Sequence, residues 1–231
     1  MALALHAVAR TDRRRLVVDG IGDASLAQAG AFVVVGGSGG IGSAIARRLA
    51  LRGAVLVLAA REQTRLEEVA GSLGAACEPI DATDFDAVER LLKGAAERFG
   101  RVAGVVNAVG SIILRPAHLT SRDDFHETIA RNLTTAFAVV RAAGKVMTDG
   151  GSVVLFSTVA AQVGLPDHDA IAAAKGAVSA LARSSMHPLG RIGTVDDIAA
   201  AACWLLDPAT SWVTGQVLSV DGGLSTVRGM A

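Results

Sequence analysis

The sequence predicts an α/β fold, with a doubly wound and mainly parallel sheet in a single domain. From residue 31 onward, short runs of apolar and β-branched residues alternate with longer segments that have helical periodicity. The apolar runs are continuous, which is typical of parallel strands that helices cover on both faces. Hydrophobic residues make up 51% of the 231-residue chain, so side chains for a large core are available.

The expected elements follow one another along the chain. The first strand, AFVVVGG (31–37), leads through a glycine-rich turn into a helix over 40–53. Further strands are expected at 54–60, 77–81, 102–110, 150–158 and 215–223. Further helices are expected at 62–73, 84–100, 122–147, 168–185 and 194–206. Right-handed crossovers then predict a Rossmann-like domain over 31–231, with residues 1–30 as an extension of unknown role.

Charge and apolar pattern exclude several classes of protein. With 22 basic and 22 acidic residues, the formal net charge is zero and gives no general attraction to nucleic acid or anionic membranes. No apolar run reaches the ~18 residues of a membrane span. The N-terminal stretch MALALHAVARTDRRR places its apolar residues before its charges, the reverse of a secretory signal, and Asp12 argues against a transit peptide. We therefore expect a cytoplasmic protein with no nucleic-acid or membrane partner.

The two cysteines give no sign of a metal site. Cys77 and Cys203 are far apart in the chain and lack the spacing of metal ligands. We expect two reduced thiols and no bound metal, as in most cytosolic proteins.

A glycine-rich turn opens the first helix. Gly36, Gly40 and Gly42 form a G-x-x-x-G-x-G pattern within VVVGGSGGIGSAIA. Glycine lets the backbone approach a pyrophosphate closely, and the amides of a helix N-terminus face the phosphate charge. Such a turn can be only a tight strand–helix connection, but its place after the first strand favours a dinucleotide site. We assign the three glycines to cofactor binding, together with Ser38 and Ile41.

The residues after the second strand select the cofactor. An acidic residue there binds the adenosine ribose 2′-hydroxyl and favours NAD. This chain has Ala60 at that position and Arg61 next to it. An arginine suits the 2′-phosphate of NADP, so we expect NADP(H) over NAD(H), although Arg61 can also be a solvated surface residue. The missing acid also argues against a methyltransferase that uses S-adenosylmethionine.

Six segments in order resemble the motifs of the short-chain dehydrogenase/reductase family. They are the glycine-rich turn, IDATD (80–84), VNAVG (106–110), RNLTTAF (131–137), SVVLFSTVAAQVG (152–164) and AIAAAKGAVSAL (170–181). The C-terminal stretch over 187–223 is also very similar to the family's. Val35 departs from the pattern, because the family usually has threonine there. One motif alone is weak, but six in the family's order are specific, and the likeness covers most of the chain.

The resemblance implies roles in cofactor binding. Asp81 would contact the adenine ring. Asn107 matches the first asparagine of the family's Asn-Asn-Ala-Gly segment, and Gly110 is its last glycine.

The resemblance also implies an active site. Asn132 matches the asparagine that orders a water relay, and Lys175 matches the lysine that binds the nicotinamide ribose hydroxyls. Thr158 stands where the family has its catalytic serine. Its hydroxyl can hold a substrate oxygen or can simply bond to backbone at the strand end, and both interpretations stay open.

The family's catalytic tyrosine is missing. In the family it lies one helical turn before the lysine, and the lysine lowers its pKa. Here that position is Ile171, and the chain contains no tyrosine. Carbonyl reduction puts negative charge on oxygen, which isoleucine can neither stabilise nor protonate. His168 is the candidate replacement acid, with Asp169 and His187 also near in sequence, although a histidine at a helix start is more often a surface or capping residue.

A second departure concerns the sheet. In the family, a sixth strand, a Pro-Gly segment and a mobile substrate flap follow the lysine-bearing helix. Here LARSSMHPLGRIG (181–193) leads directly to the C-terminal segment. We expect either the last strand, 216–220, or a partner chain to cover the open edge.

The resemblance implies an NADP(H)-dependent oxidoreductase that acts on a small carbonyl compound or alcohol. The alternative is a catalytically silent nucleotide-binding protein, either a redox sensor or a subunit packed against an active paralogue. The resemblance also implies a homodimer or homotetramer. The expected contacts come from small residues on helices 122–147 and 168–185, namely Ala136, Ala142, Ala143, Ala173, Ala177 and Ala180.

Overall fold

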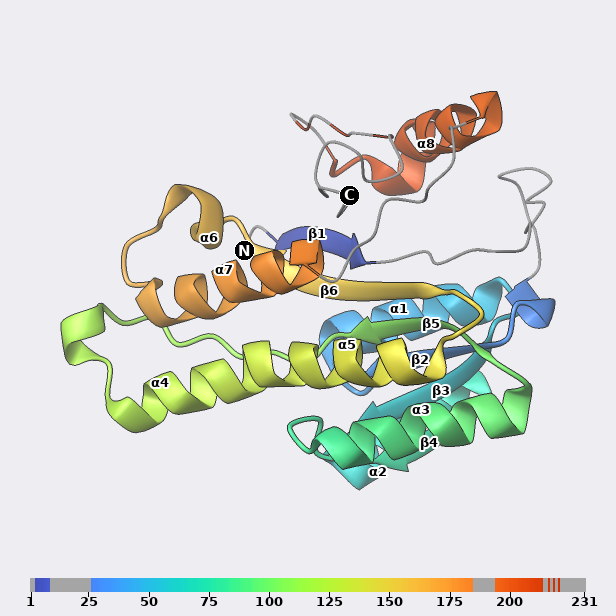
Figure 1. Cartoon of the computed structure of the whole chain (residues 1–231), viewed down its shortest axis with the longest axis horizontal. Helices are drawn as coiled ribbons and strands as arrows, with labels where there is room; N and C mark the ends of the chain where they lie inside the picture. The colour runs from blue at the N-terminus through green and yellow to red at the C-terminus, as the bar shows by residue number, and fades with distance from the viewer. Residues whose placement is uncertain are drawn as a thin grey trace, which may run out of the picture.

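The computed structural model describes residues 3–8, 26–184 and 194–213, together with residues 216, 218 and 220. Six strands of this part of the chain form one sheet in the order β1-β6-β5-β2-β3-β4. Helices lie on both faces of the sheet (Figure 1). The expected α/β fold is confirmed, because every strand but β1 pairs in parallel: β2 (Ala31–Val35), β3 (Val55–Ala60), β4 (Ala76–Pro79), β5 (Val102–Asn107) and β6 (Ser152–Thr158).

The helices begin and end close to the expected residues. The main ones are α1 (Gly40–Leu51), α2 (Gln63–Leu73), α3 (Phe85–Phe99), α4 (Arg122–Ile129), α5 (Thr135–Val146), α7 (Asp169–Ser184) and α8 (Val195–Leu206). Short turns that we did not expect are α6 (Ala160–Val163), η1 (Leu26–Gln28), η2 (Ala117–Leu119) and η4 (Pro208–Thr210). Glu62 and Asp84 are N-caps, since their carboxylates accept backbone N–H groups of α2 and α3. None of the described helices is long and apolar enough to span a bilayer.

The central strand β2 explains why the strand pattern is continuously apolar. Val33 and Val35 pack in the core that the sheet shares with α3, α5 and α7, whereas Val34 packs in a second core under α1 and α2. Adjacent side chains of a strand point to opposite faces, so each residue of β2 needs an apolar side chain.

Three alanines expected at a subunit interface lie elsewhere. Ala136, Ala142 and Ala143 are at most 5% exposed and belong to the core under α5. Their side chains pack against α3 and the sheet of their own chain, so that part of the expectation is wrong. Small residues favour close helix packing, and here the close helix neighbour is α3 of the same molecule.

The expected long helix over 122–147 is interrupted. Between α4 and α5, residues Ala130–Thr134 form one π-helical turn, η3. The side chains of Thr128, Asn132 and Thr135 each donate a hydrogen bond to the carbonyl oxygen four residues earlier. Such bonds compete with the backbone pattern of an α-helix, and π-turns are common at functional sites.

Residues expected to be only an extension contribute a strand. Leu3–Val8 forms β1, which pairs antiparallel with β6 along its whole length, from Leu3 opposite Thr158 to Val8 opposite Val153. Figure 1 shows β1 alongside β6 at the edge of the sheet. We expected the final strand or a partner chain there, but β1 provides the partners that the edge of β6 needs.

The expected C-terminal strand over 215–223 lies mostly outside the described residues. Gln216, Leu218 and Val220 are described, and they are not in a strand. Residues 185–193, which precede α8, and His187 among them, also lie outside the described residues.

Candidate active site

The turn between β2 and α1 is shaped by close backbone contacts. Gly36 has a φ of +83°, and a Cβ there would lie 2.8 Å from the carbonyl carbon of Ala108. A Cβ on Gly42 would overlap the carbonyl oxygen of Gly36. The turn therefore needs glycine at both positions for its own geometry, before any ligand is considered.

Gly40, the first residue of α1, is different. A Cβ there would meet no described atom within 4 Å. The N-cap residue Gly39 makes no side-chain hydrogen bond, so the amides of the first turn are left for another acceptor. Ser38 is buried in the turn, whereas Ile41 is 39% exposed. An open approach to the amides of a helix N-terminus suits a pyrophosphate.

The end of β3 is attached to this turn. The carbonyl oxygen of Ala59 accepts hydrogen bonds from the N–H groups of Gly36 at 2.7 Å and Gly37 at 3.0 Å. Ala60 ends the strand, and the exposed Arg61 follows. Arg61 forms no ion pair within the described residues. A cation is thus available next to the glycine-rich turn.

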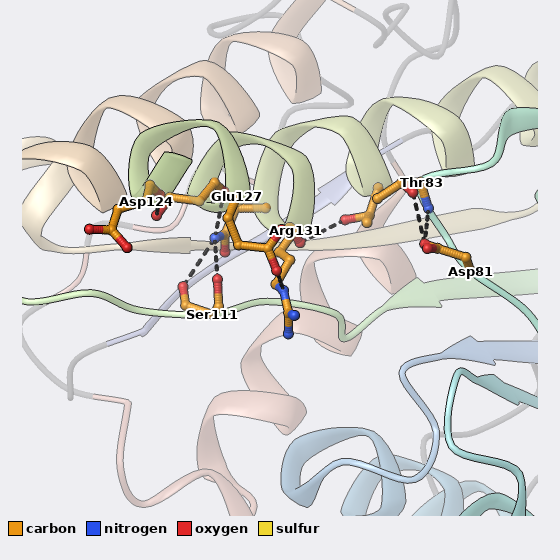
Figure 2. A network of polar contacts seen from close by, with 9 residues as sticks. Asp81, Thr83, Ser111, Asp124, Glu127 and Arg131 are labelled. Atoms are coloured by element: carbon orange, nitrogen blue, oxygen red, sulfur yellow. Dashed lines mark hydrogen bonds and ion pairs between the residues drawn. The ribbon is translucent and has the colours of Figure 1, made fainter. Parts of the chain in front are cut away.

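Asp81 lies at the carboxyl end of β4. Its Oδ1 accepts hydrogen bonds from the N–H of Thr83 at 2.9 Å and from its hydroxyl at 2.8 Å. These bonds hold the pKa of Asp81 below its usual value, and the charges of Arg61 and Arg131 lower that pKa further. Figure 2 shows Arg131, which also pairs with Glu127, between the Asp81–Thr83 contact and Ser111. Arg131 was not among the residues selected from the sequence, because only the fold brings its helix near Asp81.

Asn107 ties the end of β5 to the interrupted helix. It is 4% exposed, and its Nδ2 donates a hydrogen bond to Thr135 Oγ1 at 3.1 Å. Its Oδ1 accepts from the N–H of Val109 at 3.3 Å, which turns the chain after the strand. Asn107 therefore shapes the loop from β5 to Gly110.

Asn132, in the π-turn, is held firmly but only through its amide nitrogen. It is 1% exposed, and Nδ2 donates to the carbonyl oxygens of Ser111 at 3.0 Å and Thr128 at 2.9 Å. Its Oδ1 is buried and has no hydrogen-bond partner among the described residues. A buried acceptor without a partner is costly, so this oxygen is suited to a water or a ligand.

Lys175 lies next to that oxygen. A Cβ on Gly110 would lie 3.0 Å from Asn132 Oδ1 and 3.8 Å from Lys175 Nζ, so both polar atoms surround one point. Lys175 is 8% exposed, and burial lowers the pKa of its ammonium to about 8. The structure thus brings together Asn132, Lys175 and Gly110, which the sequence analysis selected from three separate segments.

Thr158 ends β6 and is half-buried. Its Oγ1 accepts a hydrogen bond from the N–H of Ala160 at 3.3 Å, which supports the interpretation that it bonds to backbone. The hydroxyl hydrogen remains able to donate to a substrate oxygen.

No side chain described at position 171 or just before it is free to protonate a substrate oxygen in the way that a tyrosine would. Ile171 is 4% exposed and lies one turn before Lys175 on α7. His168 Nδ1 is 2.6 Å from the carbonyl oxygen of Pro166, and Asp169 Oδ2 accepts the N–H of Ala117 at 2.6 Å. Two of the three candidates for a replacement acid are therefore engaged in loop contacts, and the third, His187, lies outside the described residues.

Comparison with known proteins gives one consistent result. A family model described as enoyl-(acyl carrier protein) reductase matches residues 35–185 and 182–225. A tropinone reductase homologue of Arabidopsis thaliana is 29% identical, over 86% of this chain and 90% of that protein. An inactive 2-(S)-hydroxypropyl-CoM dehydrogenase of Xanthobacter autotrophicus is 30% identical, over 79% of this chain and 100% of its own.

The fold comparison agrees. A solved short-chain type dehydrogenase/reductase from Mycobacterium ulcerans has a TM-score of 0.63 and 25% identity, over 87% of this chain and 91% of that one. A short-chain dehydrogenase from Bacillus anthracis has a TM-score of 0.62 at 22% identity, over 86% and 97% of the two chains.

Proposed function

This chain belongs to the short-chain dehydrogenase/reductase family, and from that membership we propose that it is an NADP(H)-dependent oxidoreductase acting on a carbonyl compound or the corresponding alcohol. One observation carries the proposal. Lys175 Nζ and Asn132 Oδ1, which has no hydrogen-bond partner among the described residues, both face Gly110 at the carboxyl ends of the strands, where the glycine-rich turn also lies. Ligands of open α/β sheets bind at the carboxyl ends of the strands.

The described residues fit a dinucleotide cofactor. Considering the described residues alone, Gly40 leaves open space before the amides of α1, and Asn132 Oδ1 is an acceptor that lacks a partner. We assign the pyrophosphate to the turn of Gly36–Gly42, the adenosine half to Arg61 and Asp81, and the nicotinamide half to the residues between Asn107 and Lys175. When bound, NADPH would supply the hydride.

The chain's own side chains would position the substrate. We propose that the hydroxyl of Thr158 donates a hydrogen bond to the substrate oxygen. Asn132 Oδ1 would hold a water, and Lys175 would orient the nicotinamide ribose through its ammonium. The low exposure of Asn132 and Lys175 favours these interactions, because water competes poorly for buried polar groups.

Cofactor choice is the first prediction. Arg61→Ala should raise the Kd for NADPH by about tenfold and change the Kd for NADH by less than about twofold, because only NADPH has the 2′-phosphate. Calorimetry with both cofactors measures this difference. Arg65→Ala is the matched control, since it removes a nearby exposed arginine from the first turn of α2. Equal affinities of the unchanged protein for NADPH and NADH would contradict the cofactor assignment.

Activity is tested with a panel of aldehydes and ketones and NADPH. We expect slow NADPH oxidation with at least one carbonyl compound. The competing function is a silent nucleotide-binding protein, and the burial of Ile171 in a chain without tyrosine favours it. A relative whose name describes it as inactive is also consistent with this alternative. Tight NADPH binding with no oxidation on any carbonyl would support the silent protein, whether as a sensor or as a subunit beside an active paralogue.

We further propose a cytoplasmic homodimer or homotetramer. Ala173 and Ala180 are exposed on α7, and Phe137 is 45% exposed on α5, so these helices offer an apolar face. Light scattering at micromolar concentration should give the mass of two or four chains. The double variant Ala173→Glu/Ala180→Glu should fold normally and give one chain's mass, because neither side chain is buried within the monomer. A monomeric mass for the unchanged protein would contradict the proposal.

A further inference from the structure

A reductase without tyrosine still needs a group that protonates the substrate oxygen. Within the part of the chain that the structure describes, the other candidates near position 171 are engaged or unsuitable. His168 and Asp169 are in loop contacts with Pro166 and Ala117. The hydroxyl of Thr158 is a poor acid near neutral pH, because an aliphatic hydroxyl does not ionise in that range.

Lys175 is held in place through its backbone. Its carbonyl oxygen accepts hydrogen bonds from Ser157 Oγ at 3.0 Å and Ser179 Oγ at 3.1 Å, and the two hydroxyls lie 2.8 Å apart. Ser157 and Ser179 are both buried, and their contact joins α7 to the last residues of strand β6. The backbone of Lys175 therefore has a defined position next to the end of β6, the strand whose last residue is Thr158.

The ammonium of Lys175 has no carboxylate partner among the described residues. The polar atom that faces Gly110 together with it is the neutral Asn132 Oδ1. The titratable or charged groups on the elements packed against α7 are His6 on β1, Arg122, Asp123, Asp124, His126 and Glu127 on α4, Arg131 on η3, and Arg141 and Lys145 on α5. Asp124 pairs with Arg115, and Glu127 pairs with Arg131. Burial alone accounts for the lowered pKa of Lys175.

We propose that Lys175 itself is the proton donor to the substrate oxygen. It would have the role that a tyrosine hydroxyl at position 171 has in the family. This proposal rests on the proposed reductase function. The carbonyl carbon accepts a hydride with its electron pair from NADPH, and the C=O π pair moves to oxygen. The oxygen then takes a proton from the ammonium. The products are the alcohol, NADP⁺ and a neutral amine, which regains its proton from solvent.

The electrostatics of the site support this role. The pKa of Lys175 is lowered to about 8, so the ammonium is the main form below that pH and gives up its proton more readily than a solvated lysine does. Carbonyl reduction needs the protonated form, so kcat/KM should fall as the pH rises through about 8. Alcohol oxidation needs the neutral amine and should rise over the same range.

The test compares Lys175→Arg, Lys175→Met and the unchanged protein. Arginine keeps the cation and donors but does not release a proton near neutral pH. Lys175→Arg should therefore bind NADPH within a few-fold of the unchanged protein. It should reduce the active carbonyl at least about a hundredfold more slowly, without the inflection near pH 8. Lys175→Met should lose both cofactor affinity and activity. His168→Ala is the control and should keep the rate and pH profile.

A second readout does not depend on turnover. The chain has three lysines, Lys93, Lys145 and Lys175, so the NMR spectrum of protein with ¹³C-labelled lysine contains few lysine signals and each can be followed separately. The resonance that is lost in Lys175→Arg should titrate near pH 8 and should shift when NADPH is added.

The outcomes separate the two proposals. Full activity and an unchanged pH profile in Lys175→Arg would overturn the proton-donor role and leave the reductase function standing. Loss of rate and inflection in His168→Ala would overturn it in the same way. An ordinary titration of Lys175, well above pH 8, would also overturn it. If Lys175 titrates near pH 8 and the protein binds NADPH but turns over no carbonyl, both the reductase function and the donor role would be overturned.

Discussion

Gly42→Ala should destabilise the protein by about 3 kcal/mol, the upper part of the range for overpacking a close-packed site. The added Cβ would overlap the carbonyl oxygen of Gly36, which belongs to rigid backbone rather than to a movable side chain. For a chain of this size, the loss corresponds to a fall in melting temperature of roughly 6–12 °C. Thermal unfolding by circular dichroism measures it.

Gly40→Ala is the matched variant in the same turn. A Cβ at Gly40 has open space, and alanine favours a helical position, so the melting temperature should not fall. NADPH affinity should nevertheless drop by at least about tenfold, because the methyl group would occupy the approach to the amides of α1. A stable Gly42→Ala variant would contradict the contact with Gly36. A Gly40→Ala variant that binds NADPH normally would contradict the place of the pyrophosphate.

Ile171→Tyr should raise the rate of carbonyl reduction by at least about tenfold, the low end of what acid–base assistance supplies when geometry is imperfect. The new phenol would lie one turn before Lys175 on α7, and the lysine cation would lower its pKa. Steady-state kinetics with NADPH and the best carbonyl of the panel measure the gain.

The control for this variant is Ile171→Phe. Phenylalanine places the same six-membered ring as tyrosine at this position, which is 4% exposed, but it has no hydroxyl group. A gain with tyrosine alone would identify the missing acid as the main obstacle. Equal rates for the two variants and the unchanged protein, with normal NADPH binding, would show that the lack of a phenol is not the main obstacle.

Local chemistry made much of this architecture predictable. Continuous apolar runs such as β2 require burial on both faces, and that requirement specifies a parallel sheet between helices. Asn132 and Lys175 could be selected as candidates from the sequence, because both belong to segments that resemble the motifs of a known family in their order along the chain. The structure brings them to one point at Gly110.

Other features depend on contacts between distant segments. The pattern of residues 3–8 is too short to show which strand it pairs with, and only the open edge of β6 makes its position understandable. The π-turn at Asn132 arises from three side chains that each bond to the preceding turn, whereas helical periodicity alone continues through the segment. Likewise, the serine pair that fixes Lys175 joins residues from β6 and α7, and no local pattern marks such a pair.

Transfer of the hydride itself can be followed with a labelled cofactor. Excess protein is mixed with NADPH that carries deuterium at C4 of the dihydronicotinamide and with the carbonyl panel, and the alcohols are analysed by mass spectrometry. A single-turnover experiment detects even slow hydride transfer, which suits a chain that has no tyrosine. We expect deuterium on the carbinol carbon of at least one product, and less of it with Lys175→Arg. Protein that binds NADPH yet transfers no deuterium to any carbonyl would contradict the proposed reductase function.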